Sequence, residues 1–486
     1  MNAERSVIFS LNGETRRIDF PNDAGYTVTT TVLEYLRSCP EYRGTKEGCA
    51  EGDCGACTVV LADIGPDREI RFRAVNSCLL FLPMLHGRLL LTVEYLARMR
   101  GKLHPLQDAL MHSHGSQCGY CTPGVVMSLY NLWKNNPRPS RTEVEDALVG
   151  NLCRCTGYQS ILNGVAKAYE RYDPVSEAEE NRTCLESLRT LHAGNLLLES
   201  GGRKYARPSS LAEALAFLAD TTEAVIINGA TDVALRVTKK FEQLPVILDL
   251  SAVEELHGWR REGNSLRLGA GMTINEIARN AGDVIPVLRT LAETFGSHQI
   301  RNLATLGGNL STASPVGDTV PLLIALGAEV ELAGRGGRRR VPVEQFIVGY
   351  RKTARGATEL VTAVVLPLPG ADEHLYWYKV SRRPDVDIAA VSCAVRFRQT
   401  ERGNVSGVIL AYGGMDDRPR RARSAESVLE GNILSEDLIA GAMEMLADEF
   451  RPLTDVRGSA HFRTRVARNL LLKFYSDHVA AGGMRS

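Results

Sequence analysis

The N-terminal part of the chain begins with alternating apolar and polar positions. This alternation spans residues 7–20 and centres on Asn12-Gly13, a dipeptide that suits a two-residue turn, so it predicts a β-hairpin. Residues 28–36 predict a short helix, and a loop rich in glycine and cysteine, residues 44–57, precedes a strand over 58–62. Together these elements predict a small α+β domain, which we place at residues 1–92.

The pattern then changes to the period of helices. One predicted helix has Thr122 as its N-cap and Pro123 at its first position. Thr142 and Glu145 have the spacing of a capping box and predict the start of another helix. A last helix places a row of apolar side chains on one face, as in a packed bundle: Ile161, Val165, Ala168 and Tyr172. This part predicts an all-helical domain over residues 93–172.

The rest of the chain alternates strands and helices. Residues 173–203 begin with an acidic stretch and contain several glycines, which predicts a linker that carries one helix. Short predicted strands at 224–228, 246–249 and 265–269 alternate with helices, which indicates a domain over 204–372. Strands at 388–397 and 405–412 precede two helices near Glu436 and Ala460. These predict a small α+β C-terminal domain over 373–486.

Composition narrows the class of protein. The 486 residues are 44% hydrophobic and 23% charged, which is typical of a globular protein. The 57 basic and 57 acidic residues balance, and we expect the one dense basic run, 335–340, to be a solvated loop. The chain starts without the apolar core of a signal peptide, and Pro83 and charged Arg88 interrupt its most apolar window, 78–96. We therefore expect a cytoplasmic protein that binds neither nucleic acid nor membrane.

Eleven cysteines in such a chain indicate metal or redox chemistry, because intracellular thiols are kept reduced. Three of them have the C-x4-C-x2-C spacing of plant-type ferredoxins, and a fourth follows the next strand. A zinc site usually has C-x2-C pairs on both sides, whereas only one is present here. The spacing predicts a 2Fe-2S cluster held by Cys49, Cys54, Cys57 and Cys78. Glycines in the loop would supply the tight turns that aim backbone N–H groups at the sulfurs: Gly48, Gly52 and Gly55.

Two further close pairs of cysteines lie at junctions between the predicted helices. Zinc remains an alternative for them, although a C-x-C pair is uncommon in structural zinc sites. Their position directly after a ferredoxin-like domain favours a second 2Fe-2S cluster, held by Cys118, Cys121, Cys153 and Cys155. The remaining cysteines have no such companions, and we interpret them as small buried hydrophobic residues: Cys39, Cys184 and Cys393.

Two glycine-bearing turns are candidate phosphate cradles. The chain lacks the G-x-G-x-x-G fingerprint, so a dinucleotide would need another binding turn. One candidate, residues 229–232, follows a predicted strand, and the other spans 305–309. Small residues allow backbone N–H groups to approach a pyrophosphate closely. Either turn alone is also compatible with an ordinary structural role.

The cysteine motifs resemble those of the molybdenum hydroxylases, the family of xanthine dehydrogenase and aldehyde oxidase. The matching segments are KEGCAEGDCGACTV, NSCL, SQCGYCTPG and GNLCRCTGY, in the family's order and spacing. This resemblance implies a β-grasp 2Fe-2S ferredoxin domain followed by a four-helix 2Fe-2S domain whose cluster lies beside molybdopterin. Gln117 matches the family glutamine that contacts that cofactor.

Later segments resemble the family's FAD domain, which folds like the vanillyl-alcohol oxidase flavoproteins. They are IINGATDV, FGSHQIRNLATLGGNLSTASPVGD and YKVSRRPDVDIAAV. The resemblance implies that Phe295 packs near the isoalloxazine, that Asp318 bonds the adenosine end, and that Lys379 with Val361 borders the ring. NAD would dock at residues 381–388. The pyrophosphate and ribityl parts would be held by Ile226, Ile227, Asn228, Gly229, Ala230, Thr231, Asp232 and Val233, and by Thr305, Leu306, Gly307, Gly308 and Asn309.

The resemblance also implies a function. Iron-sulfur and FAD domains without a molybdopterin domain are similar to the small subunit of the bacterial xanthine dehydrogenases. A molybdopterin-binding large subunit would then oxidise hypoxanthine and xanthine, and electrons would pass through two clusters to FAD and on to NAD, or to oxygen. We expect a heterotetramer with two copies of each chain. Three residues beside the second cluster either form the docking surface or, for the two tyrosines, pack inside the bundle: Gln117, Tyr120 and Tyr158.

Other functions stay open at this point. The same electron-transfer role would serve an aldehyde or N-heterocycle hydroxylase, because the substrate contacts would lie on the partner. A self-standing NADH-dependent reductase would run electrons outward from NADH. A cluster-based redox sensor would not need the flavin segments.

Overall fold

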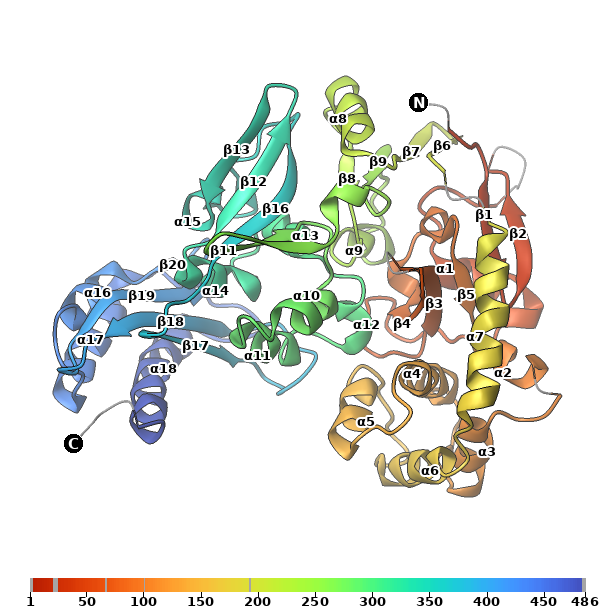
Figure 1. The fold of residues 1–486 in the computed structure, drawn as a ribbon, viewed down its shortest axis with the longest axis horizontal. Coiled ribbons are helices and arrows are strands. Elements are labelled where there is room, and N and C mark those ends of the chain that lie inside the picture. The colour runs from red at the N-terminus through yellow and green to blue at the C-terminus, as the bar shows by residue number, and fades with distance from the viewer. Residues whose placement is uncertain (1–2, 21–24, 66–67, 100, 192–193, 483–486) are drawn as a thin grey trace. The chain divides into compact units, whose positions relative to one another are not determined.

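The computed structural model describes residues 3–20, 25–65, 68–99, 101–191 and 194–482 (Figure 1). The positions between these ranges, which include residues 192 and 193 of the predicted linker, lie outside the described residues. The chain divides into two compact units, of which the first comprises the residues up to Glu254 together with Ser297–Ala304. The second comprises Glu255–Gly296 and the residues from Thr305 onward. No helix within the described ranges combines the length and the apolar character needed to cross a membrane.

The first unit begins with a five-stranded sheet in the order β2-β1-β5-β3-β4. The predicted hairpin is confirmed: β1 pairs antiparallel with β2, and Asn12 and Gly13 have φ values of 55° and 92°. Helix α1 begins later than predicted, because Thr31 caps it in a capping box with Glu34. The elements are β1 (Val7–Leu11), β2 (Glu14–Ile18), α1 (Val32–Ser38), η1 (Pro40–Tyr42), β3 (Thr58–Ile64), β4 (Ile70–Asn76), η2 (Ser77–Leu79), η3 (Leu82–Leu85) and β5 (Leu89–Leu91).

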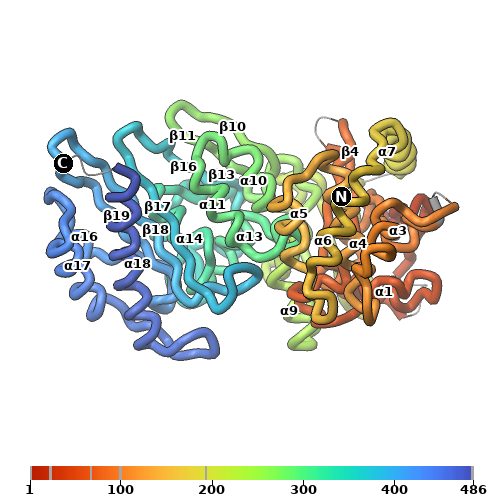
Figure 2. Tube along the Cα trace, turned by 90° about the horizontal axis from the view of Figure 1, so that it is seen from below, coloured from red at the N-terminus to blue at the C-terminus, as the bar shows by residue number. Residues whose placement is uncertain are grey.

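A group of helices follows, and Figure 2 shows α3 to α6 gathered together in orange. Two predicted starts are corrected. Cys121, not Thr122, is the N-cap of α4, and the capping box of α5 consists of Ser140 and Glu143, two residues before the predicted one. The helices are α2 (Val93–Met99), α3 (Pro105–His112), α4 (Thr122–Asn135), α5 (Arg141–Leu148) and α6 (Gln159–Tyr169).

The predicted linker contains a 16-residue helix, α7 (Pro174–Arg189), and a strand, β6 (Leu196–Ser200). A buried ion-pair network ties α7 to α4. The side chain of Lys134 is fully buried, and its Nζ lies 2.8 Å from Glu177 Oε2 and 3.7 Å from Glu180 Oε2. The α7 segment is therefore packed against the helical domain instead of extending as a free connector.

The first unit ends with a four-stranded sheet in the order β6-β7-β9-β8, in which β9 runs parallel to both of its neighbours. The apolar side chains of Ile227, Ala230 and Ala234 belong to the same core cluster as Cys57 and Cys78. This core therefore joins the second sheet to the first. The elements are β7 (Arg203–Arg207), α8 (Leu211–Asp220), β8 (Val225–Ile227), α9 (Val233–Thr238), β9 (Val246–Asp249) and α12 (His298–Arg301).

The second unit contains a five-stranded antiparallel sheet in the order β10-β11-β16-β12-β13. Short helices accompany it. The elements are η4 (Glu254–Leu256), which begins at the boundary of the units, then β10 (Trp259–Glu262), β11 (Ser265–Gly269), α10 (Ile274–Ala281), α11 (Val287–Glu293), α13 (Leu306–Thr312), α14 (Thr319–Leu326), β12 (Glu329–Gly334), β13 (Gly337–Pro342), α15 (Val343–Phe346), β14 (Ile347–Gly349), β15 (Lys352–Thr353) and β16 (Leu360–Pro367).

The basic run at 335–340 is not a loop, which corrects the prediction. Its last residues form the edge strand β13. Three arginines there are paired with carboxylates: Arg338 with Glu331 at 2.9 Å, Arg339 with Glu359 at 2.7 Å, and Arg340 with Glu262 at 3.2 Å. A charged edge strand lacks the apolar alternation on which the prediction relied, and its charges discourage pairing with another chain.

The C-terminal part of the second unit is a four-stranded sheet, β17-β18-β19-β20, with α14 and α18 packed on β18. The two predicted strands and two predicted helices are present, and the structure adds β17, β20 and α16. The elements are β17 (Glu373–Val380), β18 (Val391–Gln399), β19 (Val405–Gly413), β20 (Arg420–Arg421), α16 (Arg423–Leu429), α17 (Glu436–Glu449) and α18 (Ala460–Ala480).

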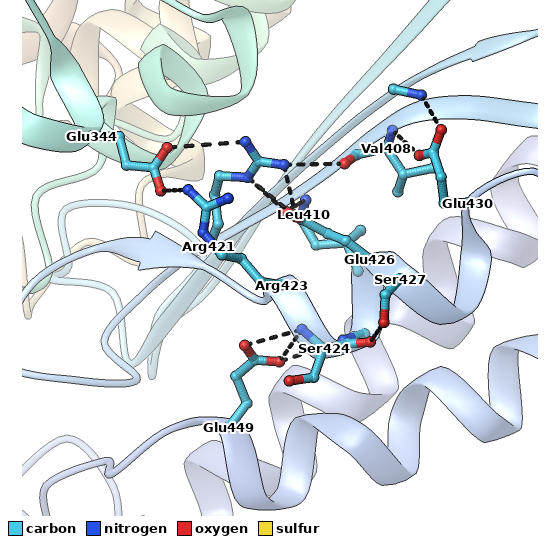
Figure 3. Close-up of polar contacts among 12 residues, drawn as sticks. Glu344, Val408, Leu410, Arg421, Arg423, Ser424, Glu426, Ser427, Glu430 and Glu449 are labelled. Atoms are coloured by element: carbon cyan, nitrogen blue, oxygen red, sulfur yellow. Dashed lines mark hydrogen bonds and ion pairs between the residues drawn. The ribbon is translucent and has the colours of Figure 1, made fainter.

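Carboxylates protect one edge of β19 (Figure 3). Glu430 accepts hydrogen bonds from the N–H groups of Gly407 and Val408, both at 2.9 Å. Glu426 accepts one from Leu410 N–H at 2.8 Å. Three backbone donors are thus satisfied without another strand, so this edge does not offer a template for aggregation.

Candidate functional site

The structure brings the four cysteines of the first predicted cluster together as two pairs. Cys57 Sγ lies 3.4 Å from Cys78 Sγ. The Cys49 and Cys54 thiols are neighbours, because each sulfur accepts the other residue's backbone N–H, at 3.3 and 3.4 Å. A 2Fe-2S cluster takes four cysteine thiolates. Two pairs of thiols suit a centre with two irons, each taking two of these ligands.

Glycines allow the loop to wrap closely around these sulfurs. Gly52 and Gly55 have φ values of 87° and 66°, which an L side chain rarely adopts. A Cβ atom on Gly48 would lie 2.6 Å from Cys54 Sγ. The tight turns predicted from the spacing are therefore required by the backbone itself.

Within each pair, the two thiols differ in pKa. A hydrogen bond from the Cys54 thiol lowers the pKa of Cys49 to about 5, and the same bond raises the pKa of Cys54. In the buried pair, the hydrogen bond between the two thiols lowers the pKa of Cys57 and raises the pKa of Cys78 well above its usual range. One thiolate per pair is thus stabilised in advance, and binding of iron would release the other proton.

The four cysteines of the second set also come together, from the start of α4 and from the loop after α5. Burial and the Cys153 thiol raise the pKa of Cys121 to about 12, and a hydrogen bond with Cys118 raises the pKa of Cys155. The pairs are therefore Cys121 with Cys153 and Cys118 with Cys155. The second pair is exposed, whereas Cys57 and Cys78 of the first site are buried.

The two tyrosines beside the second site have different roles. Tyr158, with a φ of 66°, accepts a hydrogen bond from Cys153 N–H at 2.8 Å and donates one to Asn151 O at 3.2 Å. Tyr120 is 51% exposed, and its hydroxyl donates to Glu47 O. Gln117 is also exposed. Tyr158 is therefore partly buried against the helical core and holds the cysteine loop, whereas Tyr120 lies on the surface.

Within the described part of the chain, no group of three or more His, Cys, Asp or Glu side chains is arranged to hold a single metal ion. The eight sulfurs gather as four pairs instead. Paired thiols are the arrangement that a binuclear iron centre needs, so the residues present fit two 2Fe-2S clusters.

The first predicted flavin turn, residues 226–233, lies in the first unit. A Cβ atom on Gly229 would lie only 1.6 Å from Leu303 O, so this glycine is required for close packing within the unit. The next residue, Ala230, has a φ of 60°. Because Ala230 belongs to the same core cluster as Cys57 and Cys78, the turn lies in the same core as the first cluster site.

The second predicted flavin turn lies in the second unit, where its two glycines differ. Thr305 caps α13 by accepting a hydrogen bond from Gly308 N–H at 3.1 Å. A Cβ atom on Gly307 would lie 2.7 Å from Ala270 Cβ, so packing explains this glycine. Gly308 is exposed, and a Cβ there would meet only Thr305 Oγ1, at 2.9 Å. The open side at Gly308 leaves room for a ligand to approach the backbone.

Asp318 and Lys379 form a buried ion pair next to Phe295. Lys379 Nζ lies 2.7 Å from Asp318 Oδ2 and donates to Thr294 O, also at 2.7 Å. The other oxygen of Asp318, Oδ1, is buried and has no hydrogen-bond partner among the described residues. Burial raises the pKa of Asp318, although Lys379 opposes this shift.

This pairing constrains the predicted roles. The resemblance implied that Asp318 serves the adenosine end of FAD and that Lys379 borders the ring. Their charged atoms are in contact, so the two side chains lie at one place in the second unit. The orphaned Oδ1 atom fits a hydrogen-bond donor of FAD, such as a ribityl hydroxyl.

The remaining predicted flavin residues are also located. Phe295 and Val361 are both buried in the second unit, and Asn309 accepts a hydrogen bond from Thr319 Oγ1 at 2.6 Å. The second unit therefore gathers all the predicted FAD residues except the turn at 226–233, which belongs to the first unit. Residues 381–388 form an irregular segment between β17 and β18 that is largely exposed.

Comparison with known protein families gives three matches along the chain. Residues 92–166 match a 2Fe-2S binding domain, residues 199–369 match the FAD binding domain in molybdopterin dehydrogenase, and residues 376–478 match the CO dehydrogenase flavoprotein C-terminal domain. Xanthine dehydrogenase from Drosophila pseudoobscura pseudoobscura is 32% identical over 96% of this chain. The chain belongs to the molybdenum hydroxylase family. It spans about two fifths of the length of the curated relatives it matches.

Solved structures agree with this placement in the molybdenum hydroxylase family. Carbon monoxide dehydrogenase from Hydrogenophaga pseudoflava matches 55% of this chain and 93% of its own, with a TM-score of 0.53 and 28% identity. Quinoline 2-oxidoreductase from Pseudomonas putida 86 matches 58% of this chain and 98% of its own, with a TM-score of 0.54 and 26% identity. The predicted multidomain α+β fold is confirmed, and the chain is an iron-sulfur and flavin electron-transfer component of this family.

Some residues at the cluster sites were not predicted. Asn76 directs its Nδ2 at Cys57 Sγ, at 3.8 Å, and Thr156 Oγ1 lies 3.0 Å from Cys153 Sγ. Both stand within three residues of a cluster cysteine, which is a weak signal in the sequence. Gln299, which contacts residues near both sites, is far from any cysteine in the sequence and gave no signal.

Proposed function

We propose that this chain is the iron-sulfur and flavin subunit of a xanthine dehydrogenase. A partner subunit with molybdopterin would oxidise hypoxanthine or xanthine, and this chain would carry the electrons to NAD. The xanthine dehydrogenases of Drosophila pseudoobscura pseudoobscura and Arabidopsis thaliana align with 96% and 92% of the chain. Its eleven cysteines are all free thiols, which supports a reducing compartment such as the cytoplasm.

The observation that supports the proposal best is the difference in burial between the two cysteine sites. Cys118 and Cys155 of the second site are exposed. Cys57 and Cys78 of the first site are buried in the core that also contains Ala230 of a predicted flavin turn. Electrons would therefore enter from a partner at the second site, pass the first, and leave through the flavin.

Each group supplies a different chemistry when bound. The two 2Fe-2S clusters carry single electrons, and FAD exchanges two electrons with NAD as a hydride. The protein's own residues would hold these groups. The eight cysteines would ligate iron, and the open backbone at Gly308 would admit the flavin phosphates or ribityl chain. Asp318 would accept hydrogen bonds from the flavin, and Lys379 would donate to it. NAD would dock near residues 381–388.

The exposed surface around the second site suits a partner. Gln117, Tyr120 and Leu152 are exposed there, and the two apolar side chains are each 51% exposed. Partly apolar patches with aromatic residues are typical of interface centres. We propose that the molybdopterin subunit docks on this surface in a heterotetramer with two copies of each chain.

The test is to assay the chain with and without a molybdopterin subunit. The complex should reduce NAD when xanthine is added. The isolated chain should oxidise NADH with an artificial electron acceptor but should not act on xanthine, because the proposal assigns the molybdenum site to the partner. Xanthine turnover by the isolated, molybdenum-free chain would contradict the proposal.

A second candidate is supported by the structural match to quinoline 2-oxidoreductase. In that case the same electron-transfer role would serve a hydroxylase of N-heterocycles. A panel of xanthine, quinoline and aldehyde substrates with the complex distinguishes the two candidates. NADH oxidation without any dependence on a partner would instead favour a self-standing reductase.

A further inference from the structure

A short segment of the flavin half of the sequence packs into the iron-sulfur unit. Ser297–Ala304 belongs to the first unit, although the residues on both sides of it belong to the second. Within it, Gln299 is fully buried, and a Cβ atom on Gly150 would lie 2.2 Å from its Oε1. The segment therefore fits closely against residues near the cluster sites.

Gln299 belongs to a hydrogen-bond network that starts at the loop of the first cluster. Gly55, which lies between Cys54 and Cys57, presents its carbonyl oxygen to Asn151 Nδ2 at 3.0 Å. Asn151 stands two residues before Cys153 of the second site. In addition, Leu152 N–H donates to Cys54 O at 2.9 Å. The backbone of the first loop is thus bonded directly to the backbone of the second.

The carbonyl of Gly55 fixes the direction of every hydrogen bond that follows. It requires the amide nitrogen of Asn151, so Asn151 Oδ1 must face the other way and accept. Ser128 Oγ donates to that oxygen at 2.6 Å. A hydroxyl has one hydrogen, so Ser128 must accept from the next partner.

Gln299 supplies the donors that complete this network. Its Nε2 lies 2.9 Å from Ser128 Oγ and 3.0 Å from Asn151 Oδ1. An amide nitrogen carries two hydrogens, which matches these two acceptors. A carboxylate or an apolar side chain at this position could not make either bond.

Two neighbours anchor the segment on either side of the network. Arg301 forms a two-bond ion pair with Asp146 of α5, at 2.7 and 2.9 Å. Asn302 Nδ2 donates to Ala74 O of β4 at 2.9 Å. The segment is therefore bonded both to the helical domain and to the ferredoxin sheet.

We infer that Gln299 is a positioning residue that fixes the two cluster loops relative to each other, through Asn151 and the Gly55 carbonyl. It acts through these residues and does not contact iron. The inference rests on the assignment of both cysteine sites as 2Fe-2S clusters, and it extends that assignment to a residue from the flavin half of the chain.

The test replaces Gln299 by methionine, which keeps the length of the side chain and removes both donors. Gln299→Met should purify with iron and flavin contents like those of the unmodified chain. The electron paramagnetic resonance spectrum of the reduced protein should show a changed magnetic interaction between the clusters, because this interaction depends on their separation. Reduction of the second cluster by NADH should slow by roughly tenfold. Loss of a hydrogen bond in the outer shell of a metal site typically lowers activity by about 10–100-fold.

Controls separate positioning from simple stability. Gln345→Met changes an exposed glutamine in α15 and should alter none of these properties. Asn151→Leu should reproduce the spectral change, and the double variant should add little to it, because both residues act in one network.

The outcomes distinguish the inference from the proposed function. A Gln299→Met protein that melts earlier but keeps the original spectrum and the original rate of cluster reduction would show that Gln299 only stabilises the core, and would overturn the inference. Absence of iron from the unmodified chain would instead overturn the cluster assignment itself.

Discussion

His86 gives the first unit a sensitivity to acid. The side chain is fully buried, and its Nδ1 accepts a hydrogen bond from Ile8 N–H at 3.2 Å. Burial, together with the positive charges of Arg207 and Arg88, lowers the pKa of His86 to about 4. The pKa of this histidine is 6.5 in the unfolded chain. Between pH 6.5 and about pH 4, the unfolded chain therefore binds a proton at His86 more readily than the folded chain does.

We expect the stability of the unit to fall as the pH drops from about 6.5 to about 4, with His86 contributing up to about 3 kcal/mol of the loss. His86→Gln keeps an acceptor for Ile8 N–H but cannot be protonated. Denaturant unfolding across this pH range should show a smaller loss for His86→Gln. Equal losses in both proteins would show that protonation of His86 does not cause the loss of stability.

Gly308 offers a test of the flavin site at the scale of one residue. A Cβ atom there meets only Thr305 Oγ1, and valine has a slightly higher helix propensity than glycine. Gly308→Val should therefore fold with a stability within about 0.5 kcal/mol of the original. It should keep both clusters yet lose most of its flavin, as measured by absorbance after purification.

The matched control is Gly336→Val, which adds the same side chain at an exposed glycine with open space around it. This variant should retain its flavin. Normal flavin content in Gly308→Val would show that the turn has only a structural role.

The two sets of candidate iron ligands could be identified because the spacing of their cysteines along the chain is itself the signal. The pairs Cys118–Cys121 and Cys153–Cys155 illustrate this, since each lies within one short segment. Gln299 could not be predicted, because its partners Ser128 and Asn151 are about 150 or more residues away in the sequence. The ion pair of Asp318 with Lys379 was missed for the same reason.

Among the elements, α7 depends on one buried cation. Lys134 lies between Glu177 and Glu180 with no exposed side-chain surface. Lys134→Met would leave two buried carboxylates without this partner, a change that typically costs about 3–5 kcal/mol. Hydrogen exchange should then become faster along α7 before the rest of the unit is affected.

Two companion variants make this prediction specific. Lys473→Met removes an exposed lysine that pairs with Asp477 on α18, and should cost less than about 1 kcal/mol. Adding Glu177→Gln and Glu180→Gln to Lys134→Met should restore part of the stability, because it removes the uncompensated charges. Unchanged exchange in Lys134→Met would show that apolar packing alone holds α7.

The existence of most elements could be predicted, but their ends and edges were less certain. Thr142 and Glu145 fit the capping-box pattern as well as Ser140 and Glu143 do, so the pattern alone does not determine which pair begins the helix. The edge strand β13 has no buried face, so it carries no apolar period to detect. Short-range patterns therefore identify elements, whereas tertiary contacts fix where they start and which ones pair.

At the scale of the molecule, the two cysteine sites should lose iron at different rates. About four irons per chain are expected for two 2Fe-2S clusters. The exposure of Cys118 and Cys155 should let an iron chelator remove the second cluster first, while the buried Cys57 and Cys78 protect the other. Iron release should then have two phases.

The variant Cys121→Ser identifies the phases, because it should lack the signal of one cluster in electron paramagnetic resonance and also the fast phase of release. Stoichiometric zinc in place of half of the iron would contradict the assignment of the second site. Loss of the slow phase instead would mean that exposure does not set the order.

The discontinuity of the first unit has a consequence for its synthesis. The unit's first part ends at Glu254, but Ser297–Ala304, which bonds to residues beside the cluster loops, is made about fifty residues later. At roughly 5–20 residues per second, the ribosome needs about 3–10 seconds to supply it. During that interval all eight cysteines have been synthesised, whereas the segment that packs beside their loops has not. We therefore expect an interval during synthesis in which Gln299 does not yet hold the two cluster loops in place.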